Sequence, residues 1–176
     1  HFAHVAEVSP VPVILYNIPG RTGVNISPET ICRLACDFDN IVAVKEASGS
    51  VDQIMRVVEN KPERFTVISG DDGLTLPLIS AGVKGVISVI ANAFPRDWSA
   101  MVKAALNGDF DSARAIHYKY LRTVRMMFAE GNPAGVKAYL AQMGIMQNVL
   151  RLPLVNVSDD LYARIADDIE RLKNGF

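Results

Sequence analysis

Short apolar runs rich in β-branched residues alternate with longer stretches of helical periodicity along the first 108 residues. Four such runs recur at intervals of roughly 20 to 30 residues, and no turn dipeptide typical of a hairpin joins one run to the next. They cover residues 12–17, 40–47, 64–72 and 85–92. Strands that are not joined by hairpins need crossover helices, and these connect parallel strands. The pattern therefore predicts an α/β fold with four βα units and a parallel sheet.

Capping residues indicate where the intervening helices begin and end. Ser27 and Pro28 suit the N-cap and first-turn positions of one helix, and Pro95 can open another. A further helix is expected at residues 51–60, and a short one should end at Gly82, since glycine commonly terminates helices. Each predicted strand is thus followed by a predicted helix.

The first eight residues carry a separate pattern. They include no initiator methionine and no signal-like apolar segment, although Phe2, Val5 and Ala6 recur at helical spacing. This spacing is typical of the last turns of a helix, and we expect the numbered chain to be the C-terminal part of a longer protein.

The strand pattern stops after residue 108. Residues 110–128 predict an amphipathic helix of about five turns, followed by a helix opened near Pro133 and a last one opened by Ser158. The apolar face of the first of these consists of Ala113, Ile116, Tyr120, Leu121, Val124, Met127 and Phe128. We predict that residues 109–176 form a helical region that packs against the βα units of residues 1–108.

Composition and charge exclude several classes of function. The chain is 49% hydrophobic and 21% charged with a net charge of −1, and its Lys and Arg residues are scattered singly, so no nucleic-acid surface is expected. No apolar stretch reaches the roughly 18 to 20 residues that span a membrane. Cys32 and Cys36 are the only cysteines, and their spacing fits neither a zinc site nor a disulfide framework. We expect a soluble cytoplasmic protein with no metal.

A lysine stands at the end of one apolar run, in VAVKEASG at residues 42–49. Alternation along a strand places Lys45 on the same face as Ala43 and opposite to Glu46, so the two neighbouring charges do not simply neutralise each other. With helices outside the sheet, Lys45 would lie on the interior side above a small residue, which leaves room for a substrate. The alternative is a lysine that passes the strand's end and reaches water, as isolated lysines commonly do.

Polar and glycine residues also end the other three runs, at the edge where parallel α/β proteins bind ligands. They are Tyr16, Asn17 and Arg21, then Ser69, Gly70, Asp71 and Asp72, and finally Ser88 and Asn92. A desolvated amine has a lowered pKa, and its neutral form attacks carbonyl carbons to form a Schiff base. Tyr16 can accept and return a proton, and Arg21 offers a planar cation suited to a carboxylate. The set predicts chemistry on a small keto acid.

Other conspicuous residues are interpreted as structural. Asp71 and Asp72 suit loop or helix-cap positions better than a magnesium site, because no further acidic residues flank them. His117 has no partner four residues away that would make a catalytic pair. The Met-Met-Phe cluster at residues 126–128 is interpreted as packing.

Four strand-end segments resemble, in order and spacing, the motifs of the dihydrodipicolinate synthase family, also called 4-hydroxy-tetrahydrodipicolinate synthase. They are LYNIPGRTG (15–23), VAVKEASG (42–49), SGDD (69–72) and GVISVIAN (85–92), and the resemblance continues through NPAGVKAYL and LRLPL. It implies strands five to eight of a (β/α)8 TIM barrel followed by a helical cap. It also implies a homotetrameric lyase of lysine and diaminopimelate biosynthesis that condenses pyruvate with L-aspartate 4-semialdehyde, with no metal or organic cofactor.

The same resemblance implies roles for five residues. Lys45 matches the lysine that forms the imine with pyruvate, and Tyr16 matches the tyrosine that relays protons. Arg21 matches the arginine that helps to hold the carboxylate of aspartate semialdehyde. Gly70 matches a glycine that lines the pyruvate pocket, and Ile87 matches the residue whose backbone contacts pyruvate.

Two alternative functions stay open. One is another pyruvate-dependent aldolase of the N-acetylneuraminate lyase or keto-deoxy sugar acid type, although Arg-Thr-Gly at residues 21–23 favours the synthase. The other is a barrel remnant that binds a small acid or a partner without catalysis. The family's first four βα units, which contribute paired threonines and a second tyrosine to the site, have no counterpart here. We therefore expect the 176-residue chain by itself to be inactive.

Overall fold

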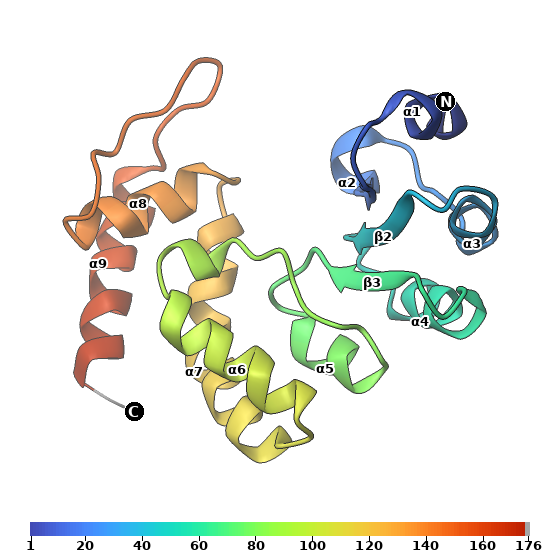
Figure 1. The fold of residues 1–176 in the computed structure, drawn as a ribbon. Helices are drawn as coiled ribbons and strands as arrows, with labels where there is room; N and C mark the ends of the chain where they lie inside the picture. Colours follow the sequence, from blue (N-terminus) through green and yellow to red (C-terminus); the bar gives the residue numbers. More distant parts are fainter. Residues whose placement is uncertain (175–176) are drawn as a thin grey trace. The chain divides into compact units, whose positions relative to one another are not determined.

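The computed structural model describes residues 1–174 and divides the chain into two compact units. The first runs from His1 to Ser88, and the second begins at Val89. The first unit contains a sheet with its helices, and the second is helical (Figure 1). No helix among residues 1–174 is both long enough and apolar enough to cross a membrane.

The first unit is built on a parallel sheet in which β2 lies between β1 and β3. The strands are β1 (Val13–Asn17), β2 (Ile41–Glu46) and β3 (Thr66–Ser69). The helices are α1 (Phe2–Val8), α2 (Pro19–Thr22), α3 (Pro28–Asp37), α4 (Val51–Asn60) and α5 (Thr75–Ser80). This order confirms the predicted alternation of parallel strands and helices, and the predicted helix at the start of the chain.

Side-chain caps fix the beginnings of the two longest helices of this unit. The hydroxyl of Ser27 accepts a hydrogen bond from the backbone N–H of Thr30 at 3.3 Å, and Pro28 occupies the first helical position of α3. The hydroxyl of Ser50 accepts from the backbone N–H of Gln53 at 3.2 Å at the start of α4. Both helices therefore begin where capping residues satisfy otherwise free backbone donors.

One face of the sheet is covered by helices and forms the core of the first unit. α3 packs against α4 and β2, and Figure 1 shows these two helices on the same side of the sheet. The buried side chains include Leu15, Ile31, Leu34, Val44, Ile54, Val57 and Val67. The other face is more open, since Ile14 is 48% and Tyr16 is 45% exposed. Alternate side chains thus point to the core and to the open face.

The fourth apolar run does not form the strand predicted over residues 85–92. Only Val86 pairs with Ser69, as an isolated parallel bridge. The N–H of Ser69 donates to the carbonyl of Gly85 at 2.8 Å, and the N–H of Ile87 donates to the carbonyl of Ser69 at 3.0 Å. No described strand lies on the other side of this segment, and its last three residues form the 3-10 helix η1 (Ile90–Asn92). The pairing is therefore too short to count as a strand.

The second unit consists of helices packed on one another. They are η1, α6 (Pro95–Leu106), α7 (Phe110–Phe128), α8 (Ala134–Gln142) and α9 (Asp159–Asn174). α6 packs against α7 and η1, while α7, α8 and α9 pack on one another. The helix expected to complete the fourth βα unit, α6, lies in this second unit.

A buried carboxylate ties three of these helices together. Asp168 on α9 is fully buried and accepts hydrogen bonds from the hydroxyl of Thr123 on α7 at 2.6 Å and that of Tyr139 on α8 at 2.8 Å. The guanidinium of Arg171 lies 2.9 Å from the same carboxyl group. Burial, with the charge of Asp168, raises the pKa of Tyr139 well above its ordinary value. The polar centre is therefore satisfied and specifies how the helices meet.

The predicted apolar face of α7 is largely confirmed. Ala113, Tyr120, Val124 and Met127 are buried and Ile116 and Leu121 are half-buried, but Phe128, the last residue of the helix, is 40% exposed. Burial also extends to polar residues that the apolar pattern did not include, among them His117 and Thr123.

The buried imidazole of His117 predicts a pH-dependent stability for the second unit. The side chain packs beside Trp98, with the two ring centroids 6.5 Å apart, and burial lowers its pKa below the ordinary value of 6.5. The unfolded chain takes up this proton more readily than the folded chain does. The free energy of unfolding should therefore fall as the pH drops through about 6.5 towards the lower pKa of the folded protein.

Trp98 allows this fall to be measured, because it is the only tryptophan and lies beside His117. Denaturant unfolding followed by tryptophan fluorescence should show lower stability at about pH 5.5 than at about pH 7.5. His117→Gln should reduce this difference. His4→Gln is the matched control, since the His4 side chain is 79% exposed, and should leave it intact. If the His117→Gln protein lost as much stability between about pH 7.5 and pH 5.5 as the unsubstituted protein, His117 would not be the source of the pH dependence.

Candidate active site

Lys45 and Tyr16 lie side by side at the carboxyl ends of neighbouring strands. Tyr16 of β1 is paired with Lys45 of β2 in the parallel register. The Nζ atom of Lys45 lies over the Tyr16 ring, 4.0 Å from its centroid. An ammonium over an aromatic face is held by the ring's negative electrostatic potential. The amine and the phenol therefore share the open face of the sheet, as the strand-end pattern predicted.

Gly70 leaves the space that the Lys45 side chain occupies. A Cβ atom at position 70 would lie 3.1 Å from Cε of Lys45 and 2.7 Å from Cβ of Ala47. The backbone N–H of Gly70 donates to the carbonyl of Glu46 at 2.7 Å, which holds the two strand ends together. Any side chain at position 70 would displace the lysine or its neighbour.

Ile87 and Arg21 complete the predicted set in different ways. The backbone of Ile87 bonds to Ser69, the residue before Gly70, so the structure brings this segment to the same strand ends as Lys45. Arg21 lies on α2, directly after β1, and is exposed. No hydrogen bond or ion pair joins its guanidinium to another residue between positions 1 and 174. The structure therefore brings four of the predicted residues together, and no described interaction joins the Arg21 side chain to them.

Behind the amine and the phenol lies a polar cluster that the sequence interpretation missed. Asn17 and Glu46 directly follow Tyr16 and Lys45, pair with each other in the sheet, and are almost fully buried. The Nδ2 atom of Asn17 donates to Oε1 of Glu46 at 2.9 Å. The sequence did contain a signal for part of this cluster, because Asn17 directly follows Tyr16 and Glu46 directly follows Lys45. We call Asn17, Asn25, Glu46 and Gln53 the amide-carboxylate cluster.

The acidic pair after β3 contributes to local structure. Oδ1 of Asp71 accepts a hydrogen bond from the backbone N–H of Leu74 at 3.1 Å, just before α5 begins. Its backbone carbonyl also accepts from the hydroxyls of Ser69 and Thr75 at 2.9 and 2.7 Å. For Asp71 this supports the interpretation as a loop or helix-cap residue, because its side chain stabilises the turn that leads into α5.

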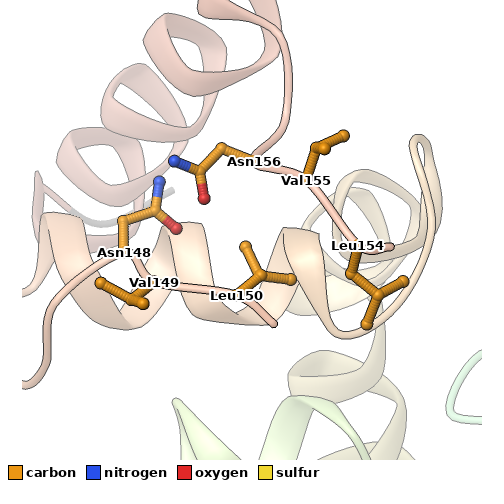
Figure 2. A pocket seen from close by; sticks show the side chains of 6 residues that line it. All are labelled: Asn148, Val149, Leu150, Leu154, Val155 and Asn156. Carbon is orange, nitrogen blue, oxygen red and sulfur yellow. The ribbon is translucent and has the colours of Figure 1, made fainter. Parts of the chain in front are cut away.

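Two cavities lie away from Lys45 and Tyr16. One of about 630 Å³ is lined by Cys36, Pro62, Glu63 and Arg64 in the first unit. The other, of about 440 Å³, lies in the segment between α8 and α9 and is lined by Asn148, Val149, Leu150, Leu154, Val155 and Asn156. Figure 2 shows the amide groups of Asn148 and Asn156 pointing toward each other across it. Neither cavity includes a predicted site residue.

The strand-end arrangement is suited to carbonyl chemistry. A primary amine can add to a ketone carbon, and a neighbouring phenol can carry protons to and from the adduct. Gly70 keeps the backbone close to the amine without a side chain in the way.

Comparisons with known proteins give a consistent family assignment. A profile of the Dihydrodipicolinate synthetase family matches residues 1–172. The 4-hydroxy-tetrahydrodipicolinate synthase of Parabacteroides distasonis is 51% identical over 172 residues, which make up 98% of this chain and 58% of that protein. The chain therefore spans less than two thirds of the length of this relative.

Solved structures agree with the sequence comparison. The crystal structure of dihydrodipicolinate synthase from Aquifex aeolicus matches with a TM-score of 0.94 and 42% identity, over 97% of this chain and 58% of that one. A dihydrodipicolinate synthase from Acinetobacter baumannii, solved in complex with pyruvate, matches with a TM-score of 0.94 and 34% identity, over 98% of this chain and 59% of that one.

Proposed function

Because the chain belongs to the dihydrodipicolinate synthetase family, we propose that its protein is a Schiff-base lyase that condenses pyruvate with L-aspartate 4-semialdehyde to 4-hydroxy-tetrahydrodipicolinate, in the lysine and diaminopimelate pathway. The observation that carries this proposal is the Lys45 amine lying over the Tyr16 ring at the strand ends. The pyruvate complex of the related Acinetobacter baumannii enzyme supports the choice of keto acid.

In the proposed reaction, Lys45 is the nucleophile. Its neutral amine adds to the C2 carbonyl carbon of pyruvate, and loss of water gives an imine. Loss of a methyl proton gives an enamine, whose terminal carbon forms the new C–C bond with the aldehyde carbon while the aldehyde oxygen takes up a proton. The amino group of the semialdehyde then attacks the imine carbon, which closes the ring and releases the Lys45 amine.

The neighbouring residues support these steps. Tyr16 relays protons to and from the adduct on Lys45, because its ring lies against the Lys45 amine. Gly70 lines the pyruvate pocket, and the backbone of Ile87 contacts the bound keto acid. Arg21 holds the carboxylate of the semialdehyde. Its guanidinium is exposed and forms no hydrogen bond or ion pair in the described part of the chain, so its N–H groups can donate to a carboxylate.

The same proposal covers the architecture and the assembly. β1, β2, β3 and the segment at residues 85–92 correspond to strands five to eight of a TIM barrel, with residues 1–108 as the barrel portion and residues 109–176 as the helical region. The active protein is a homotetramer. Both cysteines are free thiols, which supports an assignment to the reducing cytoplasm.

Trapping of the imine tests this function directly. Treatment of the protein at its full natural length with pyruvate and borohydride should attach a reduced pyruvyl group to Lys45, located by peptide mass spectrometry. Lys84, which is exposed in the same unit, should remain unmodified as an internal control. Aspartate semialdehyde added before the borohydride should consume the imine and lower the amount of trapped adduct. N-acetylmannosamine added in the same way should leave the amount of adduct unchanged. Absence of the adduct would favour a non-catalytic binding protein, and discharge by the sugar would favour another aldolase.

A further inference from the structure

A buried carboxylate lies directly behind the proposed catalytic pair. Glu46 is 0% exposed, and it accepts hydrogen bonds from three groups. Its Oε1 atom accepts from Nδ2 of Asn17 at 2.9 Å and from the backbone N–H of Ser48 at 2.9 Å. Its Oε2 atom accepts from Nε2 of Gln53 at 3.2 Å, and Nδ2 of Asn17 lies at 3.2 Å from it as well. Both oxygens are therefore satisfied by N–H donors.

The donors are neutral. No lysine or arginine forms an ion pair with Glu46 within residues 1–174. A buried charge without a counter-ion is costly unless its hydrogen bonds are complete, so each donor of the cluster contributes to keeping Glu46 in place. The cluster is accordingly sensitive to any change that turns one of its acceptors into a donor.

The cluster also joins four separate segments of the first unit. Asn17 lies on β1, Glu46 on β2 and Gln53 on α4. Oδ1 of Asn25 accepts from Nδ2 of Asn17 at 2.9 Å and from Nε2 of Gln53 at 3.1 Å. Oδ1 of Asn17 accepts from the backbone N–H of Ile26 at 3.0 Å. These bonds close the segment from residue 18 to residue 25, which carries Arg21, onto the ends of both strands.

This placement links the cluster to the amine and the phenol. Asn17 and Glu46 are the last residues of their strands and directly follow Tyr16 and Lys45, so they point to the opposite face. A side chain that fixes the end of a strand also fixes the direction of the side chain before it. Positioning of reacting groups to within fractions of an ångström commonly depends on such supporting hydrogen bonds.

We propose that Glu46 is a positioning residue that acts through Asn17, Asn25 and Gln53 to hold Tyr16 and Lys45 in the relative placement that imine formation requires. This inference rests on the proposed function, in which the Lys45 amine attacks pyruvate. Glu46 itself does not contact the substrate, because its carboxyl group is buried on the other face of the sheet.

Glu46→Gln is the principal test. The glutamine side chain has nearly the same size and shape as glutamate. Its NH2 group faces one of the three donors, so one hydrogen bond of the cluster is replaced by a contact between two donors. In the protein at its full natural length, the rate of borohydride trapping of pyruvate at Lys45 and the turnover number should both fall, on the order of 10- to 100-fold. The KM for pyruvate should change much less, because the pocket is not altered.

A second substitution provides the rescue. In the Asn17→Asp/Glu46→Gln double variant, the glutamine amide donates to the new carboxylate, which can still accept from the N–H of Ile26. The Asn25 amide, which accepts from Asn17 in the unsubstituted protein, turns to donate to this carboxylate, and the donor-acceptor match is restored. Its trapping rate should exceed that of Glu46→Gln. The matched control is Glu29→Gln on α3, whose carboxylate is exposed and paired with Arg56, and it should leave the rate unchanged.

The outcomes separate the inference from the function. No adduct in the unsubstituted protein would refute the proposed lyase activity. The positioning role would be overturned if the unsubstituted protein and Glu46→Gln formed the adduct at the same rate. It would also be overturned if the double variant formed the adduct no faster than a folded Glu46→Gln protein. If Glu46→Gln does not fold, Gln53→Ala removes the amide that donates to Glu46 and exchanges hydrogen bonds with Asn25, on the partly exposed side of the cluster. It should slow trapping by a smaller factor, and an unchanged rate would overturn the role.

Discussion

Replacing Lys45 with alanine should abolish condensation, with a loss of turnover on the order of 10⁴-fold or more, because the substitution removes the amine that forms the imine. The fold should remain intact, since the Lys45 side chain lies against the exposed ring of Tyr16 and beside Gly70 and forms no described hydrogen bond or ion pair. The consumption of both substrates measures the first expectation, and circular dichroism with thermal unfolding measures the second.

Two further variants sharpen this experiment. Lys45→Arg retains a cation over the Tyr16 ring but supplies no nucleophilic amine, so it should be as inactive as the alanine variant. Lys84→Ala removes an exposed lysine of the same unit and should leave turnover unchanged. A Lys45→Ala protein with turnover near that of the unsubstituted protein would disprove the proposed mechanism.

Replacing Tyr16 with phenylalanine should slow turnover by roughly 10² to 10⁴, the range expected when a positioned proton-transfer group is lost. The phenylalanine ring can still pack beneath the Lys45 ammonium, so the placement of the amine and the KM for pyruvate should change little. Steady-state kinetics with both substrates separates these two effects.

The control for this substitution is Tyr118→Phe on α7, which removes the hydroxyl group of a tyrosine that is 62% exposed. Its turnover number should match that of the unsubstituted protein. An unchanged turnover number in the Tyr16→Phe protein would show that this ring only packs against the lysine.

Much of the fold could be predicted because its signals are local. The helices expected at residues 51–60 and 110–128 have these bounds in the structure, where capping side chains of Ser50 and Asp109 satisfy backbone donors at their starts. The run at residues 85–92 failed as a strand for the opposite reason. Its composition is typical of a strand, but strand formation also depends on pairing with other strands, and within residues 1–174 this run pairs only through the single bridge from Val86 to Ser69.

The candidate site divides in the same way. The pairing of Tyr16 with Lys45 was predictable, since equivalent ends of adjacent parallel strands meet at one edge of the sheet. The amide-carboxylate cluster was not, because Asn25 and Gln53 reach Glu46 only through the tertiary fold. The same holds for Asp168, whose partners Thr123 and Tyr139 lie 45 and 29 residues away along the chain.

The order of the strands gives the two reacting residues different numbers of neighbouring strands in the described sheet. Lys45 lies on the central strand and is held by neighbours on both sides, whereas Tyr16 lies on β1, which in the described sheet has a single neighbour. The Lys45 backbone is therefore held from both sides in the described sheet, whereas the Tyr16 backbone is held from one side and by the hydrogen bonds of the adjacent Asn17, so the amide-carboxylate cluster carries more of the placement of the phenol than of the amine.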